Sequence, residues 1–294
     1  MDPTGDWTNA TAPAVEPGHL YGHVLRPEEF LRHARYDHAV PDSRLRRWID
    51  RYWSVTWDLG PGRMHRVTTL DEPSTHLTRE WGGVRREGTD GAGTWITGPV
   101  TQGRFDVTQH EAGGVVGVRF RLGGTTAFTR ADLTALRDRT VPAADWFGAD
   151  LPPPDLPSTA TGAAPALDAW LLAREPREDP GAAAFQEVLA LLEDPETTGT
   201  AVLERRSGRS IRSLQRQFQR YVGVGPKRML LRARVMDAVA AIDRGDPRSL
   251  ADLAQGLGWF DQSHFIRDFR TVTGRTPSSY AGSRGDRATG ILPP

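Results

Sequence analysis

Two short stretches of the sequence gather side chains that can hydrogen-bond to the edges of nucleobases. They read "SIRSLQRQF" from residue 210 and "DQSHFIRDF" from residue 261. Arginine pairs with guanine, glutamine pairs with adenine, and serine or histidine adapts to a base or a phosphate. The candidate base-contacting residues are Arg212, Ser213, Gln215, Arg216, Gln219, Gln262, Ser263, His264, Arg267 and Arg270. Such side chains on one face of a short helix fit the major groove of DNA.

The two stretches belong to a unit that occurs twice. When the C-terminal region is shifted by 51 residues, positions of the same chemical type coincide. The pairs are Ser210 with Asp261, Leu214 with Phe265, Arg216 with Arg267, Phe218 with Phe269, Gly223 with Gly274 and Pro226 with Pro277. A turn glycine, Gly208 or Gly258, comes shortly before each cap, because glycine accepts the left-handed conformation at a helix end. Each unit therefore reads as helix, glycine turn, N-cap and second helix.

The second helix of each unit is expected to be amphipathic. At about 100° per residue, Phe265 and Phe269 share a buried face in one copy, and Leu214 and Phe218 share one in the other. The candidate base-contacting residues then face outward. This pattern predicts a helix-turn-helix, present twice. The alternative is a plain helical hairpin with a solvated polar face, which the duplication disfavours.

A long, mostly apolar helix is expected between the units, over residues 226–246. Pro226 suits the first turn of such a helix. The helix would hold the two units so that both meet one face of DNA, roughly 34 Å apart. Arg220, Lys227 and Arg228 are candidate phosphate contacts, with ordinary solvated surface as an equal interpretation.

The charge of the chain is divided unevenly, although the net charge is zero. Residues 198–290 hold 17 arginines and lysines against 8 acidic residues, so the rest of the chain is acidic. A basic region of this kind indicates an anionic partner, with nucleic acid the first candidate.

At these residues the sequence resembles the AraC/XylS family of transcription regulators. The resemblance covers about residues 198–280 and is strongest in "LADLAQGLGWFDQSHFIRDFRTVTGRTPSSY" and "SLQRQFQRYVGVGPKRML". It implies a monomeric DNA-binding domain whose two helix-turn-helix units enter adjacent major grooves. The first unit departs from the family pattern at Glu204, Ser207 and Arg209, which predicts a less well packed first helix.

The N-terminal half has the pattern of a small β-sheet domain. Residues 45–122 contain short alternating segments separated by glycine-rich turns, which predicts a barrel or a sandwich. The segments "RYWSVTWDL", "TWITGPVTQG", "VVGVRFRLGG" and "LRDRTVPAADWFG" also resemble a domain of unknown function often found ahead of AraC-type domains. That resemblance implies a cupin-like β-barrel that senses a small molecule or dimerises.

A proline-rich connection follows the expected barrel. Residues 151–165, "LPPPDLPSTATGAAP", are not expected inside a helix because proline removes a helical hydrogen bond. Helices are expected at 166–174 and 181–193. The expected organisation is a disordered N-terminus at 1–20, a barrel at 21–150, a connection with helices at 151–197, a DNA-binding domain at 198–282 and a loose tail at 283–294.

No motif points to catalysis by the N-terminal half. The chain has no cysteine, which excludes thiol catalysis and cysteine-ligated zinc. His65, His76 and His110 stand singly rather than in the paired spacing of a metal-binding cupin, so neither a metal nor a cofactor is expected. The candidate ligand-pocket residues are Trp53, Trp57, His76 and Arg119. The alternative for the tryptophans is that they simply fill a core.

These features predict an α+β protein of two domains, with a small cupin-like β-barrel and helices followed by an all-α domain containing two helix-turn-helix units. The expected function is that of a sequence-specific DNA-binding transcription regulator, not an enzyme, controlled by a small-molecule effector or by dimerisation. Its expected partners are double-stranded DNA, the effector, a second copy of the chain and, for an activator, RNA polymerase. Neither a secretory signal nor a membrane span is recognised, so a cytoplasmic location is expected. Two alternatives stay open: the barrel is itself an enzyme, or it only dimerises.

Overall fold

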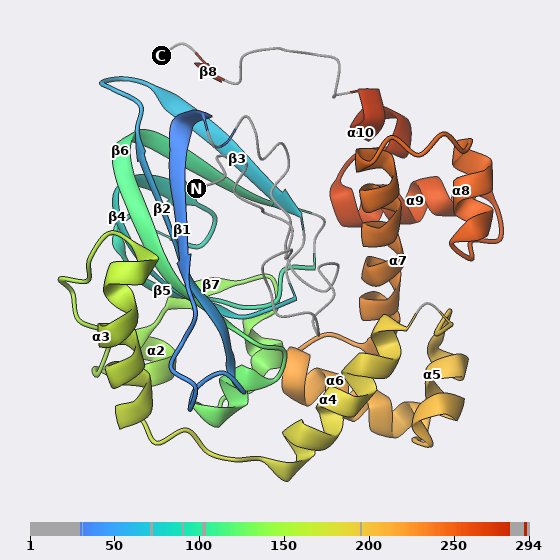
Figure 1. Ribbon diagram of the computed structural model, residues 1–294, viewed down its shortest axis with the longest axis horizontal. Coiled ribbons are helices and arrows are strands. Elements are labelled where there is room, and N and C mark those ends of the chain that lie inside the picture. Colours follow the sequence, from blue (N-terminus) through green and yellow to red (C-terminus); the bar gives the residue numbers. More distant parts are fainter. Residues whose placement is uncertain are drawn as a thin grey trace.

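The computed structural model describes residues 30, 32–70, 73–89, 91–101, 104–194, 196–282 and 291–292. It has an N-terminal β-sheet with flanking helices and a C-terminal group of helices (Figure 1), which confirms the predicted α+β fold. The predicted disordered segment at 1–20 lies outside the described residues. So does the predicted tail, apart from the short strand β8 (Ile291–Leu292). None of the helices within the described ranges is long and apolar enough to cross a membrane.

The sheet is antiparallel and is built around one long strand. Its strands are β1 (Ala34–Ala39), β2 (Ile49–Asp58), β3 (Met64–Leu70), β4 (His76–Arg86), β5 (Gly93–Thr97), β6 (Arg104–Phe120) and β7 (Thr140–Pro142). They follow the order β1-β2-β6-β4-β5-β7, and β3 lies beside the first half of β6. β6 pairs with β3 up to His110 and with β2 from Ala112 onward, so one strand serves two neighbours along the same edge.

The sheet bends at the middle of β6. Glu111 has a left-handed φ of 46°, and the pairing with β4 changes register between Gly82 and Gly83. A Cβ on Gly82 would lie 2.4 Å from the carbonyl oxygen of Ala112, so the bend requires glycine. Irregularities of this kind bend and twist a strand. The result is a bent, open sheet that does not close into the expected barrel, since no pairing among the described strands joins β1 or β3 to β7.

One face of the sheet packs against helices. The covering elements are the short helices η3 (Leu133–Leu136) and α2 (Ala144–Phe147), and the longer α3 (Ala160–Ala173); another short helix, η2 (Gly124–Ala127), follows β6. The hydroxyl of Tyr52 in β2 donates a hydrogen bond to Oδ1 of Asp168 in α3 at 2.7 Å. Oγ of Ser54, two residues along β2, accepts the backbone N–H of Ala160 at 2.8 Å. These bonds hold α3 on the sheet, and the opposite face is left to line a pocket.

α3 begins earlier than the sequence indicated. It starts at Ala160, so Pro165 is its sixth residue, and the expectation that residues 151–165 contain no helix is wrong for the last six of them. Pro165 removes one helical hydrogen bond. Two contacts at the start of the helix offset this loss: Oγ1 of Thr159 accepts the N–H of Gly162 at 3.2 Å, and Ser54 binds Ala160.

The C-terminal helices form two cores that share one long helix. They are α4 (Pro180–Glu193), α5 (Thr200–Ser207), α6 (Ile211–Val222), α7 (Pro226–Asp243), α8 (Leu250–Gly256), α9 (Gln262–Thr273) and α10 (Pro277–Gly282). The first core joins α4, α5 and α6 to the beginning of α7, and the second joins the rest of α7 to α8 and α9. Figure 1 shows α7 upright, with α5 and α6 at one end and α8 to α10 at the other. The expected connecting helix is therefore present.

Candidate nucleic-acid interface and ligand pocket

α6 and α9 begin with matching side-chain caps. Oγ of Ser210 accepts the backbone N–H of Ser213 at 3.3 Å, and Oδ1 of Asp261 accepts the backbone N–H of His264 at 2.7 Å. These caps satisfy donors that the first turn of a helix leaves without an internal partner. Both helices end at a glycine in the left-handed conformation. The repeat read from the sequence is thereby confirmed at both ends of the two helices.

Each of these helices is anchored by two apolar residues four positions apart. Leu214 and Phe218 in α6, and Phe265 and Phe269 in α9, are all 0% exposed. Burying side chains of this size contributes about 1.5–3 kcal/mol each. The predicted buried faces are confirmed, and they set which residues of α6 and α9 face outward.

The outward faces of α6 and α9 carry the candidate base-contacting residues. In α6, the exposed candidates are Arg212, Gln215 and Arg216, and the half-buried ones are Ser213 and Gln219. In α9, the exposed candidates are Gln262, Ser263, His264, Arg267 and Arg270. The chain thus presents two similar polar faces at the two ends of α7. Contact of these residues with bases stays a prediction.

His264 differs from the other candidates because its own helix holds it. Its Nε2 lies 3.2 Å from Oδ2 of Asp268, which also accepts the indole N–H of Trp259 at 2.9 Å. Trp259 is buried below the turn, where its ring packs against Phe265. Only the Nδ1 edge of His264 is therefore left for a base.

The three candidate phosphate contacts have different surroundings. Lys227 is exposed in the first turn of α7. Arg220 forms an ion pair with Oδ2 of Asp179 at 2.8 Å, at the start of α4. Arg228 donates a hydrogen bond to the backbone carbonyl of Thr101 in the N-terminal domain. Lys227 therefore suits a phosphate contact best, because the two arginines already have partners within the protein.

In the first helix-turn-helix unit, α5 buries little apolar surface and is held mainly by hydrogen bonds. Leu203 is the one residue of α5 that is fully buried, in keeping with the less well packed helix expected from the family pattern. Oε1 of Glu204, however, accepts the backbone N–H of Ile211 at 2.8 Å and so joins α5 to the start of α6. Arg209 donates to the carbonyl of Ala184 in α4 at 3.3 Å. Glu204 and Arg209, which depart from the family pattern, thus hold the α5–α6 turn in place with hydrogen bonds.

Phe260 was not among the residues predicted from the sequence, but its exposure is conspicuous in the structure. It lies in the turn between α8 and α9, immediately before the cap Asp261, and is 95% exposed. The neighbouring Trp259 is only 4% exposed. Both residues are large and aromatic, so hydropathy could not show which of them faces inward.

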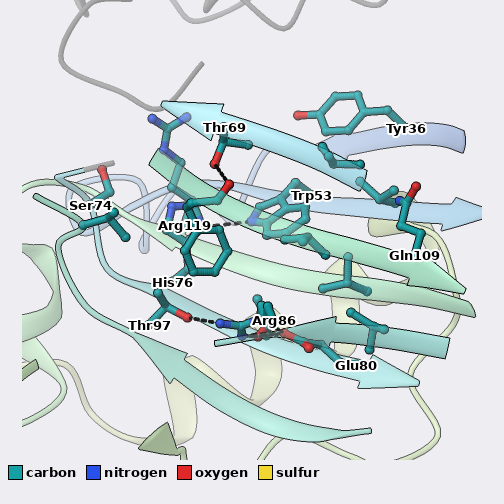
Figure 2. Close-up of a pocket in the computed structure, with 18 of the residues that line it drawn as sticks. Tyr36, Trp53, Thr69, Ser74, His76, Glu80, Arg86, Thr97, Gln109 and Arg119 are labelled. Atoms are coloured by element: carbon teal, nitrogen blue, oxygen red, sulfur yellow. Dashed lines mark hydrogen bonds and ion pairs between the residues drawn. The ribbon is translucent and has the colours of Figure 1, made fainter. Parts of the chain in front are cut away.

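The other face of the sheet encloses a pocket of about 220 Å³ (Figure 2). The four residues predicted from the sequence all line this pocket: Trp53, Trp57, His76 and Arg119. The indole N–H of Trp53 donates to Nδ1 of His76 at 3.2 Å, which places the proton of a neutral His76 on Nε2. A water molecule occupies about 30 Å³ in the liquid, so the space suits a small organic molecule.

Two polar clusters interrupt the largely aromatic and aliphatic lining. In the first, Arg51 of β2 is paired with Arg119 of β6. Oδ2 of Asp50 lies 2.7 Å from Nε of Arg51 and 3.7 Å from Nε of Arg119. In the second, Arg86 donates to Oε1 of Glu80 at 2.5 Å. Figure 2 places Arg119 and the Glu80–Arg86 pair on different parts of the wall. A few fixed polar groups in an apolar pocket are typical of sites for small molecules.

The sequence did not single out Arg51, Glu80 and Arg86 as pocket residues. Arg51 could have been found, because it precedes Trp53 and Trp57 at the same alternation. Glu80 and Arg86 follow the alternation of His76 along β4, but Gly82 and Gly83 between them indicated a turn. Within the described ranges, no cluster of three His, Cys, Asp or Glu side chains is placed to hold a metal ion.

Residues 97–101, here called the coupling segment, lie between the pocket and the first helix-turn-helix unit. Thr97, Gly98 and Val100 line the pocket. Pro99 approaches the turn after α6, because a Cβ on Gly223 would lie 3.5 Å from its ring.

The coupling segment is also held at its far end. The N–H and the hydroxyl of Thr101 both donate to the carboxylate of Asp138, at 2.5 and 2.6 Å, while its carbonyl accepts from Arg228 of α7. One short piece of chain therefore lines the pocket and contacts the α6–α7 region.

Comparison with known proteins divides the chain in the same way. Residues 203–283 match the family described as a helix-turn-helix domain, and residues 37–142 match a domain of unknown function (DUF6597). The chain is 36% identical over 123 residues to the HTH-type transcriptional activator RhaS of Escherichia coli, covering 40% of this chain and 44% of that protein. RhaS of Pectobacterium carotovorum is 32% identical over 69 residues, 24% of each chain. The match thus spans less than half the length of these relatives.

Two solved structures overlap with most of the chain but only loosely. ToxT from Vibrio cholerae gives a TM-score of 0.38 at 10% identity, covering 84% of this chain and 97% of ToxT. The AraC-like transcriptional activator CuxR gives a TM-score of 0.19 at 10% identity, covering 87% of this chain and 88% of CuxR. Similarity at this level says nothing about ligands or residue roles.

Proposed function

We propose, from the AraC-type helix-turn-helix domain that residues 203–283 form, that this protein is a sequence-specific DNA-binding transcription regulator. The observation that carries the proposal is the pair of capped, anchored helices, α6 and α9, with exposed polar faces at the two ends of α7. Arginine and glutamine on such faces read guanine and adenine in the major groove. A cytoplasmic location is part of the proposal, because chromosomal DNA would be the partner there.

The proposed contacts fall into three groups. The first group is proposed to reach base edges or adjacent phosphates; it consists of Arg212, Gln215 and Arg216 of α6 and Arg267 and Arg270 of α9. The second group is proposed to complete the polar faces of α6 and α9; it consists of Ser213, Gln219, Gln262, Ser263 and His264. Lys227 is proposed to bind a phosphate, which fixes position on the duplex without reading sequence.

We also propose that a small molecule in the pocket controls DNA binding. The coupling segment supports this, because a ligand that displaces Gly98 or Val100 also displaces Pro99 and Thr101. Those two residues contact the α6–α7 turn and Arg228, respectively. A ligand can shift DNA affinity only if it binds the two arrangements of this segment with different strength.

The proposed partners are therefore double-stranded DNA and a small-molecule effector. A second copy of the chain, and RNA polymerase if the protein activates transcription, are further proposed partners. The matched relatives are transcription activators, so the sheet domain is proposed to sense rather than to catalyse.

DNA binding is tested by changing one arginine on each face. A duplex is selected from a random-sequence pool by the full-length chain, and its affinity is measured by fluorescence anisotropy at fixed salt. Arg216→Ala and Arg267→Ala should each cost about 1–3 kcal/mol and relax specificity in different half-sites. Arg205→Ala, in the exposed last turn of α5, is the control and should change little. Parental affinity and selectivity in both test variants would show that these faces do not read DNA.

A further inference from the structure

Phe260 is the most exposed large apolar side chain in the described part of the protein. It is 95% exposed, and Val40, at 63%, is the other large apolar residue that stands out in this way. A single exposed apolar residue needs no explanation by itself. Phe260 is unusual because it stands on a turn that holds it outward, directly beside a candidate reading face.

The turn below Phe260 is firmly held. Arg234 of α7 donates to the carbonyl of Gly258 at 3.1 Å, and its guanidinium lies 4.8 Å from the ring centre of Trp259. The indole N–H of Trp259 is bound to Asp268. Trp259 therefore occupies the core position at this turn, and Phe260 cannot replace it without breaking these contacts.

Phe260 also lies at the end of α9 that would approach the bases. Residues at the N-terminal end of a recognition helix contact base edges, and Phe260 immediately precedes the cap Asp261. The apolar feature of the major groove is the C5-methyl group of thymine, which apolar side chains contact. A ring held outward by its turn loses little conformational freedom when it binds.

We propose that Phe260 packs against the methyl group of a thymine next to the bases that α9 reads. This inference rests on the proposed DNA-binding function and adds a specificity-determining residue to it. The first unit has no equivalent: its turn is one residue shorter, and Arg209, which precedes the cap Ser210, binds Ala184. The thymine contact therefore belongs to the half-site of the second unit.

The test removes the methyl group and the ring separately. In the selected duplex, each thymine is replaced in turn by deoxyuridine, which lacks only the C5-methyl group. Dissociation constants are measured for the full-length parent, Phe260→Ala and the control Val40→Ala. One replacement in the second half-site should weaken parental binding roughly three- to tenfold. Phe260→Ala should lose a similar factor and become insensitive to that replacement, whereas Val40→Ala should behave as the parent.

The outcomes separate this contact from the regulator proposal. A parent that selects no duplex refutes both. A parent that binds selectively, with Phe260→Ala showing the same affinity and the same deoxyuridine response, refutes the thymine contact alone. Loss of transcriptional output with unchanged DNA affinity also refutes it, because Phe260 would then meet a protein. Thermal unfolding of Phe260→Ala should match the parent, since the side chain is exposed.

Discussion

Arg228 of α7 donates a hydrogen bond to the backbone carbonyl of Thr101, in the segment that forms one wall of the pocket. The same segment places Thr97, Gly98 and Val100 in the pocket lining. Arg228, in the helix-turn-helix domain, is thus bonded to Thr101, and the preceding residue, Val100, lines the pocket. Coupling between two binding sites must be reciprocal, so DNA should affect the coupling segment as a ligand affects DNA binding.

Arg228→Ala should weaken this coupling. In the parent, binding of the selected duplex should change hydrogen exchange in peptides that cover residues 97–101. In Arg228→Ala that response should shrink, because the bond from α7 to Thr101 is lost. Lys227→Ala is the neighbouring control: it should lower DNA affinity through a lost phosphate contact but keep the response. An unchanged response in Arg228→Ala would show that another contact carries the coupling.

The paired anchors Phe218 and Phe269 should contribute independently to stability. Both are 0% exposed, and they belong to different cores. Replacement of either by alanine should lower the free energy of unfolding by about 3–5 kcal/mol through lost burial and a cavity. The double variant should show the sum within about 0.5 kcal/mol, because distant sites add. Urea unfolding of the two single variants and the double variant measures these losses. A strong deviation from additivity would mean that the two cores do not unfold independently.

Glu204→Ala should destabilise the first helix-turn-helix unit. The carboxylate of Glu204 accepts the N–H of Ile211, a donor at the start of α6. Losing such a cap costs about 0.5–2 kcal/mol. Glu204→Gln keeps an acceptor oxygen and should recover most of the loss, as measured by urea unfolding. Equal stability of the alanine variant and the parent would mean that solvent replaces this bond without cost.

Stability should fall as the pH rises because of Glu193 at the end of α4. Burial raises the pKa of the Glu193 carboxyl to about 8, from 4.5. Between these values the folded state binds a proton that the unfolded chain does not, so this contribution is complete below about pH 4.5 and is lost as the pH rises through about 8. Glu193→Gln, which stays neutral, should flatten the decline.

The free energy of unfolding in urea is measured at several pH values between 5 and 8 for the parent, Glu193→Gln and Glu187→Gln. Glu187→Gln, on the exposed side of the same helix, is the matched control and should keep the parental slope. A parental slope in Glu193→Gln would place the pH dependence elsewhere.

The C-terminal domain was largely predictable because its signals are local. Caps, anchors and turn glycines act within one or two helical turns, and the repeat showed each signal twice. The identity of Ser210 and Asp261 therefore predicted where α6 and α9 begin. Phe260 escaped prediction because the choice between it and Trp259 depends on Arg234 and Asp268, which lie elsewhere in the sequence.

The N-terminal domain was predictable only in part. Alternation placed Trp53 and Trp57 on one face, and both line the pocket. The open sheet could not be foreseen, because closure depends on pairing between strands far apart in the chain. The early start of α3 also depends on a distant partner, Ser54 of β2. Contacts of this range leave no periodic trace in the sequence.

Hydroxyl-radical footprinting of the full-length protein on its selected duplex shows whether α6 and α9 read two adjacent major grooves. Two protected patches should appear on one face of the DNA, centred about 10 base pairs apart. Arg216→Ala should weaken one patch and Arg267→Ala the other. A single patch, or two patches that weaken together in both variants, would contradict binding in two adjacent grooves.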